Sequence, residues 1–576
     1  MQTQQLYLEW CSAPAVDAQT KAELAAISPD PREIEERFYR ELEFGTAGLR
    51  GILGAGTNRM NRYVVRRATQ GLADYLLAVP DAKERGVCIA YDSRHYSQEF
   101  AKETAMVLAA NGIAVYLFES LRSVPQLSFT MQQLHCMAGV VITASHNPKQ
   151  YNGYKVYGAY GGQCAPDQAA AIYNCMQRVE MFGAKLIDFD AAVACGAIHM
   201  IGAQEDEFYY MATQRLLLCP DFMKLHGGAL KLVYTPLHGT GNRPVQTLLS
   251  RVGMANVTVV PEQQMPDGDF PTVTAPNPED PAAFELAIAL AEEKGATVCL
   301  ATDPDADRLG IAVKTGEGAW MTLTGNQIGC ILLEHILSEL VAQNRLPENG
   351  VVIKSIVSTR LADAIAQRYG VALIDVMTGF RFIGEKVDEY AKTGEKTFLF
   401  GFEESYGFLA GGLARDKDAI CAAMLAAETC VICQNKGITL YDMLRDIYAH
   451  YGFYKEKVKS YTSEGKRGME LISVCMEGLR TASPTCVACV PVLAVEDYRM
   501  GRCVDSEGNV SAIKQPPSNM LRFLLKNGAW IVIRPSGTEP KLKLYIGANE
   551  MTEDAVDATL NRLFSDMDGR IQKLLQ

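Results

Sequence analysis

Three aspartates at alternate positions carry the clearest chemical signal. They lie in Thr302-Asp-Pro-Asp-Ala-Asp-Arg308, directly after the apolar run Val298-Cys-Leu-Ala301. Closely spaced carboxylates without sulfur suit a hard divalent cation such as Mg²⁺. A solvated acidic turn is the weaker alternative, because three unpaired carboxylates so close together repel one another. The residues expected to bind the cation are Asp303, Asp305 and Asp307.

A serine directly after a buried strand is the second chemical feature. Gly139-Val-Val-Ile142 runs into Thr143-Ala-Ser-His-Asn-Pro148, whose residues favour tight turns. Ser145 is therefore expected on a rigid edge as a reactive group, against the alternative of an ordinary polar turn. A Ser-His-Asp hydrolase is disfavoured, because adjacent side chains on an extended backbone are expected to point in different directions and no Gly-x-Ser-x-Gly elbow surrounds Ser145.

Two further segments suit a phosphorylated sugar. Gly401-Phe-Glu-Glu-Ser-Tyr-Gly407 offers carboxylates and a hydroxyl to neighbouring sugar hydroxyls, although a helix N-terminal cap explains Glu403 and Ser405 nearly as well. Arg534-Pro-Ser-Gly-Thr-Glu-Pro-Lys541 combines an arginine fork, two hydroxyls and a glycine amide, which suits a phosphate; a hairpin turn is its alternative. No P-loop or dinucleotide-binding pattern accompanies these segments, which disfavours nucleotides.

Alternating strand and helix patterns must position these segments. Such βαβ patterns begin near Val87, Leu230 and Val351. They predict three α/β domains in series, with each chemical segment beyond the carboxyl end of a strand. A Lys-rich link at 455–467 is expected to lead to a smaller α+β domain that ends in a helix from Glu553. The predicted domains are 1–210, 211–325, 326–455 and 456–576.

The composition places the chain among large globular proteins. Apolar residues make up 48% and charged residues 21% of 576 residues. The net charge of -12 argues against nucleic acid or an anionic membrane as a partner. Scattered cysteines, and the absence of an export signal or a membrane-length apolar run, predict a cytoplasmic protein. Zinc is disfavoured at Cys430/Cys433 and Cys486/Cys489, which fall in helix-like and strand-like runs.

The four chemical segments, in this order, resemble those of the α-D-phosphohexomutase superfamily. Thr143-Ala-Ser-His-Asn-Pro148, Asp303-Pro-Asp-Ala-Asp-Arg308, Gly401–Gly407 and Arg534–Pro540 match its phosphoserine, metal, sugar and phosphate loops. Gly45-Thr-Ala-Gly-Leu-Arg-Gly51 resembles its N-terminal motif. The resemblance spans nearly the whole chain. It implies an α/β protein of four domains, in which three similar domains with mixed sheets and a C-terminal α+β domain surround a central active-site cleft.

The resemblance also implies roles for individual residues. Ser145 would carry a phosphate that is bridged by Mg²⁺ to the three aspartates, with glucose 1,6-bisphosphate as activator and intermediate. Arg308 would stabilise the transferring phosphoryl group. Lys155 is the implied general base, with His146 and Lys417 as alternatives. The implied substrate-binding residues are Arg50, Thr378, Gly379, Glu403, Ser405, Lys417, Arg534, Ser536, Gly537 and Thr538.

The implied reaction is the interconversion of α-D-glucose 1-phosphate and glucose 6-phosphate. Glu403-Glu-Ser-Tyr-Gly407 resembles the glucose form of the sugar loop and lacks the Ser-Gly-His ending of mannose- and glucosamine-specific relatives. Phosphopentomutase and phosphomannomutase reactions on the same fold are the alternatives. An Asp-x-Asp phosphatase and a non-catalytic sugar-phosphate sensor are alternatives of other classes. The only expected partner is a small phosphosugar, and the sequence indicates no oligomeric state.

Overall fold

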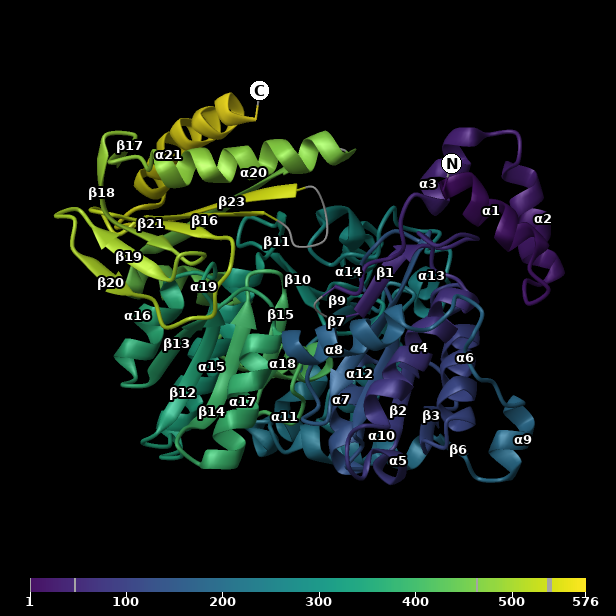
Figure 1. The fold of residues 1–576 in the computed structure, drawn as a ribbon. Coiled ribbons are helices and arrows are strands. Elements are labelled where there is room, and N and C mark those ends of the chain that lie inside the picture. The colour runs from purple at the N-terminus through teal and green to yellow at the C-terminus, as the bar shows by residue number, and fades with distance from the viewer. Residues whose placement is uncertain (1, 46–47, 463–464, 536–540, 576) are drawn as a thin grey trace. The chain divides into compact units, whose positions relative to one another are not determined.

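Two compact units make up the chain in the computed structural model, which describes residues 2–45, 48–462, 465–535 and 541–575 (Figure 1). The first unit comprises Met1–Ile328 and Phe380–Tyr441, and the second comprises Gly329–Gly379 and Asp442–Gln576. The chain changes unit inside helix α15 (Gly325–Ala342), between Gly379 and Phe380, and inside helix α19 (Leu440–Tyr451).

Three helices that the sequence patterns did not predict open the first unit. They are α1 (Gln2–Ser12), α2 (Ala18–Ile27) and α3 (Pro31–Phe38). Asp17 and Asp30 cap α2 and α3 through their side chains. Trp10 packs edge-to-face against Phe38 and against Tyr63 of the following domain, so these helices share a small aromatic core with it.

A mixed six-stranded sheet follows, in the order β1-β5-β4-β2-β3-β6. Strands β2, β3, β4 and β6 are parallel, whereas β5 runs antiparallel to β4 and to β1. The strand bounds are β1 Gly48–Ile52, β2 Val87–Tyr91, β3 Val115–Phe118, β4 Ala138–Ile142, β5 Tyr151–Gly158 and β6 Ile198–Ile201.

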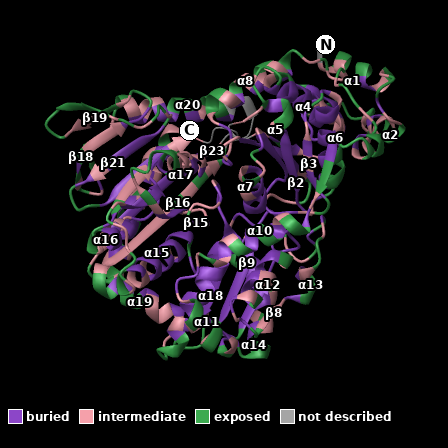
Figure 2. Cartoon of the chain, turned by 90° about the horizontal axis from the view of Figure 1, so that it is seen from below, coloured by how far each residue is buried: buried purple, intermediate pink, exposed green. Residues whose placement is uncertain are grey.

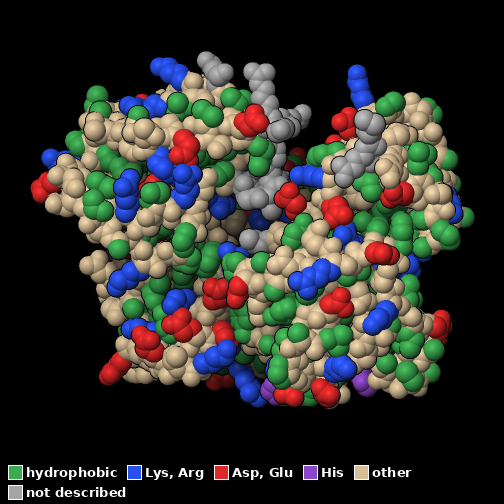
Figure 3. Space-filling model, viewed as in Figure 1, with side chains coloured by type: hydrophobic (Ala, Val, Ile, Leu, Met, Phe, Trp, Pro, Cys, Tyr) green, Lys and Arg blue, Asp and Glu red, His purple; other side chains and the backbone are tan. Residues whose placement is uncertain are grey.

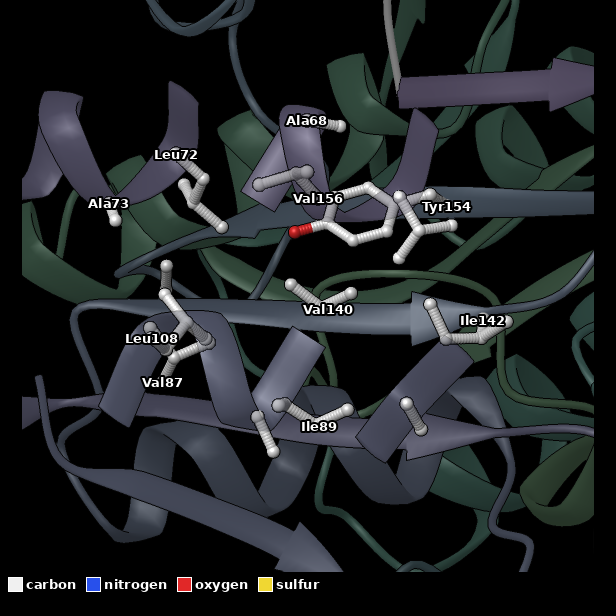
Figure 4. Close-up of a cluster of buried hydrophobic side chains, with 14 of the residues drawn as sticks. Ala68, Leu72, Ala73, Val87, Ile89, Leu108, Val140, Ile142, Tyr154 and Val156 are labelled. Carbon is white, nitrogen blue, oxygen red and sulfur yellow. The ribbon is translucent and has the colours of Figure 1, made fainter. Parts of the chain in front are cut away.

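Helices cover both faces of this sheet, which explains why its central strands are apolar throughout. Helices α4 and α6 pack on one face, where Figure 4 shows Leu72 and Leu108 against Ile89 and Val140; α7 packs on the other. The helix bounds are α4 Arg62–Leu76, α5 Ala82–Arg85, α6 Ser97–Ala110, α7 Val124–Gln133, α8 Pro166–Gln177, α9 Phe189–Ala194 and α10 Ala203–Gln214.

The second sheet has the order β11-β10-β9-β7-β8. Its strands β9 and β10 form an antiparallel hairpin whose turn is the aspartate segment. The strands are β7 Leu232–Thr235, β8 Val257–Val259, β9 Val298–Thr302, β10 Leu309–Lys314 and β11 Trp320–Thr322. Its helices are α11 Pro220–His226, η1 Gly227–Ala229, α12 Asn242–Arg251, α13 Pro261–Gln264, η2 Pro281–Phe284 and α14 Glu285–Lys294.

The last part of the first unit carries the sugar-loop segment on a hairpin. Strands β14 (Thr397–Glu403) and β15 (Gly407–Ala410) pair antiparallel. They lie between α17 (Arg381–Thr393) and α18 (Ala419–Asn435), a helix that is buried along almost its whole length and packs on β9, β10 and α12.

The second unit contains a parallel strand pair and a large antiparallel sheet. Strands β12 (Gly350–Ser355) and β13 (Ala372–Val376) are joined by α16 (Leu361–Arg368). The large sheet has the order β16-β23-β22-β21-β18-β19-β20. Its elements are β16 Phe453–Thr462, α20 Gly465–Thr481, β17 Cys486–Val487, β18 Val490–Asp497, β19 Arg502–Asp505, β20 Val510–Ala512, β21 Leu521–Leu525, β22 Trp530–Pro535, β23 Lys541–Glu550 and α21 Glu553–Leu574.

The Lys-rich link predicted at 455–467 is wrong. Its first part is β16, a ten-residue strand that pairs along its whole length with β23. Two lysines of this strand bind acidic residues of α21: Lys455 contacts Asp557, and Lys459 contacts Asp568 at 2.6 Å. A charged strand is stable here because the helix that covers it carries the opposite charge.

Buried residues concentrate in the sheets and the helix faces against them (Figure 2). On the face seen in Figure 3, Lys and Arg side chains are interspersed with Asp and Glu. Within the described residues, no helix is both long enough and apolar enough to cross a membrane.

Candidate active site

Ser145 lies in the tight turn after β4, as its position in the sequence predicts. Its backbone adopts φ 51°, a left-handed conformation that is unfavourable for a side chain with a Cβ. Its amide donates to Thr143 Oγ1 at 2.8 Å, and its Oγ donates to Asp303 Oδ2 at 2.7 Å. The serine is only 3% exposed. The fold thus holds one hydroxyl, in a strained turn, against one carboxylate of the aspartate segment.

Arg94, which sequence reasoning missed, holds this turn from behind. Its buried guanidinium donates to the carbonyl oxygens of Pro148 and Tyr151 at 3.0 and 3.1 Å, and to those of Ser145 and Asn147. The only sequence signal was Asp92-Ser-Arg94 directly after the buried strand β2. Several backbone contacts from one rigid guanidinium explain how the strained serine turn is maintained.

The aspartate segment forms the turn between β9 and β10. Ala306 at its tip has φ 50°. Its backbone is bound by surrounding elements: Val124 N donates to Asp305 O at 2.9 Å, Thr240 N to Pro304 O at 2.8 Å, and Ala419 N to Ala306 O at 3.3 Å. The first residues of α7 and α18, and a residue shortly before α12, therefore fix the position of this turn.

The three aspartate carboxylates meet, as predicted. One oxygen atom of each lies within 4.8 Å of the others, and all three residues are buried. Burial, with the charges of Asp305 and Asp307, raises the pKa of Asp303 well above its usual range. Among the described residues, Asp305 Oδ1 and Asp307 Oδ1 accept no hydrogen bond. Buried carboxylate oxygens without donors fit a divalent cation, so the triad can hold a metal ion.

Two lysines approach the triad from different elements. Lys155 Nζ lies 2.8 Å from Asp305 Oδ2 and 3.6 Å from Asp307 Oδ2. Lys417 Nζ lies 3.1 Å from Asp307 Oδ2. Burial opposes ionisation of Asp307, but Lys417, Lys155 and Arg308 outweigh it and lower its pKa. Likewise burial disfavours the Lys417 cation, but Asp307 and Asp416 outweigh burial and raise its pKa.

Lys155, the general base that the resemblance implies, lies on strand β5 and not in the loop after β4. The loop after β4 ends at Gln150, and β5 begins at Tyr151. In the antiparallel register Lys155 is opposite Val141, near the end of β4. Because β5 runs back along β4, its early residues return to the edge of the sheet where Ser145 lies.

His146 and Arg308 are the residues next to Ser145 and to Asp307 in the sequence. His146 Nδ1 is 3.3 Å from Ser145 Oγ. Burial and the positive charges of Arg308 and Arg50 lower the pKa of His146 well below its usual value, so that the imidazole is neutral. Arg308 pairs with Glu279. Arg50, on β1, donates to Asn147 Oδ1 at 3.2 Å.

The predicted sugar segment is bound to the aspartate turn through its backbone. Arg308 and Gly407 form an isolated antiparallel bridge, and Leu309 N donates to Tyr406 O at 3.1 Å. Glu403 ends β14, and Ser405 lies in the turn that leads to β15. The alternative of a helix cap is wrong, because a strand and no helix follows.

The phosphate segment belongs to the second unit, between the paired strands β22 and β23. Arg534 Nη1 donates to Thr378 Oγ1 at 2.5 Å, which brings together two predicted substrate-binding residues. Gly379 has φ 115°, a conformation that favours glycine. The predicted residues Ser536, Gly537 and Thr538 lie outside the described residues.

Family models for four domains match the chain in order. The models of phosphoglucomutase/phosphomannomutase alpha/beta/alpha domains I, II and III match residues 41–182, 207–316 and 324–451, and the C-terminal domain model matches 501–563. The chain belongs to the phosphoglucomutase/phosphomannomutase family. The predicted fold of three α/β domains and a C-terminal domain is confirmed. The predicted borders at 210, 325 and 455 stay a prediction.

Curated relatives within this family extend over nearly the whole chain. The chain is 38% identical to a phosphoglucomutase of Staphylococcus haemolyticus, over 92% of this chain and 95% of that protein. It is 35% identical to a phosphoglucomutase of Staphylococcus aureus, over 92% and 94%.

Solved structures share the family fold at lower identity. A putative phosphomannomutase of Thermus thermophilus superposes with a TM-score of 0.66 at 22% identity, covering 92% of this chain and 99% of that one. The Paramecium phosphoprotein parafusin, a phosphoglucomutase in an open form, gives a TM-score of 0.69 at 18% identity, covering 93% and 96%.

Proposed function

We propose that this chain is a phosphoglucomutase, an isomerase that interconverts α-D-glucose 1-phosphate and glucose 6-phosphate. The observation that carries the proposal is the hydrogen bond of 2.7 Å from Ser145 Oγ to Asp303 in a buried cluster of three aspartates. A hydroxyl beside a cation site is suited to carry a phosphoryl group. Relatives named phosphoglucomutase, at 38% identity over 92% of the chain, support the same reaction.

The cation in this proposal is Mg²⁺, held by Asp303, Asp305 and Asp307 together with the phosphate on Ser145. All three ligands are carboxylates, the type that hard cations prefer. Bound Mg²⁺ supplies positive charge that offsets the charge developing on the transferring phosphoryl oxygens.

Ser145 gives and receives the phosphoryl group. The bond from phosphorus to Ser145 Oγ breaks as a sugar hydroxyl oxygen bonds to phosphorus, which leaves a bisphosphate and a free serine. The bisphosphate, glucose 1,6-bisphosphate, then returns its other phosphate to Ser145. The strained turn and the Arg94 contacts keep Oγ in one position for both steps.

Lys155 is the proposed general base: in its neutral amine form it takes the proton of the attacking hydroxyl at Nζ, and it later returns that proton. Its hydrogen bond to Asp305 keeps Nζ beside the cation site. Arg308 stabilises charge on the phosphoryl oxygens. His146 supports the serine turn in this scheme, because it is neutral, flanked by Arg308 and Arg50, and adjacent to Ser145.

Ten residues are proposed to contact the substrate. Arg50, Glu403, Ser405 and Lys417 belong to the first unit, and Thr378, Gly379, Arg534, Ser536, Gly537 and Thr538 to the second. The second group is proposed to bind the phosphate that is not being transferred. We also propose a cytoplasmic location, since all sixteen cysteines are free thiols.

The test is incubation with glucose 1-phosphate, Mg²⁺ and a trace of glucose 1,6-bisphosphate, in which glucose 6-phosphate and free phosphate are both measured. We expect glucose 6-phosphate without free phosphate. Free phosphate alone would indicate an Asp-x-Asp phosphatase, and neither product would indicate a sensor. Mannose 1-phosphate and ribose 1-phosphate, assayed in parallel, test the substrate, and faster turnover of either would refute the preference for glucose.

A further inference from the structure

The ammonium group of Lys417 is bound between two carboxylates. Its Nζ lies 3.0 Å from Asp416 Oδ1 and 3.1 Å from Asp307 Oδ2. All three side chains are buried, with 9%, 1% and 2% of their surface exposed for Lys417, Asp416 and Asp307. Asp307 is a proposed metal ligand, whereas Asp416 lies outside the triad. Asp416 can therefore bind the Lys417 ammonium without also binding the proposed cation.

Asp416 is itself fixed by the first domain. Tyr157 Oη and Gln163 Nε2 each donate to Asp416 Oδ2 at 2.9 Å, and the Lys417 amide donates to Oδ1 at 2.9 Å. Tyr157 stands two residues after Lys155 on β5, so both side chains leave the same face of that strand. One strand thus carries the proposed general base and the anchor of Asp416.

The stem of Lys417 is confined as well. A Cβ added at Gly407 would lie 2.2 Å from Lys417 Cδ, so the lysine passes directly over the glycine backbone. Its Nζ lies 5.4 Å from the centre of the Phe380 ring. With its stem and its ammonium group both enclosed, Lys417 has little rotamer freedom left to lose when a ligand binds.

We propose that Asp416 is a positioning residue, which holds the Lys417 ammonium in place for the sugar phosphate independently of Asp307. A cation at the triad takes up the charge of Asp307 and weakens its attraction for Lys417. Asp416, anchored by Tyr157 and Gln163, keeps its own hydrogen bond to Nζ. The inference rests on the proposed function for the identity of the ligand.

Asp416→Asn preserves the shape of the side chain and removes its charge. If the carboxylate acted only through its charge, its removal beside an anion site would strengthen binding of the anionic sugar phosphate. If Asp416 instead positions the Lys417 ammonium, the substitution should weaken binding of the sugar phosphate. We expect about a tenfold increase in the dissociation constant of glucose 1-phosphate and in KM, because the Asn amide oxygen accepts a weaker hydrogen bond from the Lys417 ammonium than the carboxylate does. Mg²⁺ affinity should change by less than about twofold.

Affinities for glucose 1-phosphate and for Mg²⁺ would be measured by calorimetry in a Ser145→Ala background, and KM and kcat in the active enzyme. Tyr157→Phe removes one donor to Asp416 and should weaken sugar-phosphate binding by about threefold. It also tests the proposal if Asp416→Asn does not fold.

Tyr209→Phe is the matched control. Tyr209 Oη donates to the buried Asp418 at 2.8 Å, which is the same kind of contact two residues along the chain. It should lower the melting temperature as Tyr157→Phe does, and leave the affinity for glucose 1-phosphate unchanged.

Unchanged or tighter binding in Asp416→Asn would overturn the inference, as would equal weakening in Tyr157→Phe and Tyr209→Phe. A wild-type enzyme without turnover would instead refute the proposed function.

Discussion

Ser145 and Asp303 in the first unit are joined by a hydrogen bond of 2.7 Å inside a network of buried charges. Arg534 and Thr378 in the second unit are joined by a hydrogen bond of 2.5 Å between half-buried residues. The serine, the triad and both lysines all belong to the first unit. The chemical step and cation binding should therefore respond to changes in the first unit, and changes at Arg534 should alter substrate affinity.

Removal of the serine hydroxyl should have the largest effect. Ser145→Ala leaves no oxygen atom to carry the phosphoryl group, so turnover should fall by about a thousandfold or more. Mass spectrometry of the wild type incubated with glucose 1,6-bisphosphate should locate a phosphate on Ser145. Near-normal turnover in the variant would contradict its assigned role.

Asp305→Asn should weaken cation binding by about a hundredfold, because one of three buried carboxylate ligands becomes a neutral amide. Calorimetric titration with Mg²⁺ measures this directly. Asp221→Asn, at a side chain that is 98% exposed on the same unit, is the control and should bind Mg²⁺ as the wild type does. Equal affinity in Asp305→Asn and Asp221→Asn would refute the assignment of the triad.

Arg534→Ala tests whether substrate affinity can change without a change in Mg²⁺ affinity. We expect KM to rise by about tenfold, since a charged hydrogen-bond donor to a phosphate is lost, and Mg²⁺ affinity to stay within about twofold of wild type. Arg502→Ala, at an exposed position on β19 of the same sheet, should change neither quantity. Loss of Mg²⁺ affinity in Arg534→Ala would contradict the assignment of cation binding to the first unit.

The smallest expected effect is on the acid stability of the second unit. Burial opposes the charge of Asp568, but Lys459 and Tyr461 outweigh it and lower its pKa. A lowered pKa means that the carboxylate stabilises the folded state above about pH 4, its unfolded value, and that this contribution is lost as the pH falls further.

Asp568→Asn should therefore lower the melting temperature at pH 7, and the difference from wild type should shrink below about pH 4. Scanning fluorimetry between pH 3 and 7 measures the difference, with Glu470→Gln, at an exposed position of α20, as the control. If the difference in melting temperature between wild type and Asp568→Asn did not change with pH, the lowered pKa of Asp568 would be contradicted.

The sequence was sufficient where an apolar strand leads into a chemically unusual loop. The aspartate turn, the serine turn and the sugar hairpin all follow strands that are buried along most of their length, and strands of that kind have a clear pattern. The meeting of the three carboxylates could be predicted because residues two apart in a short segment cannot separate far.

The features that the sequence did not predict depend on contacts between segments that are distant in the chain. Arg94 binds backbone carbonyl groups more than fifty residues away, and no side-chain pattern records such contacts. The left-handed conformation of Ser145 is equally invisible, because serine has no general preference for it. Strand β16 was missed because a lysine-rich segment is typical of an exposed link. Only the structure shows that acidic residues of α21 pair with its lysines.

The backbone bridge between Arg308 and Gly407 fixes the lengths of two loops together. Inserting or deleting one residue in either turn would shift its partner out of register, even if every side chain that contacts sugar or cation were kept. For protein engineering, the turns at 302–309 and 401–407 therefore form one exchangeable cassette. Transplanting the sugar turn of a relative with different specificity should succeed only when its aspartate turn is transplanted with it.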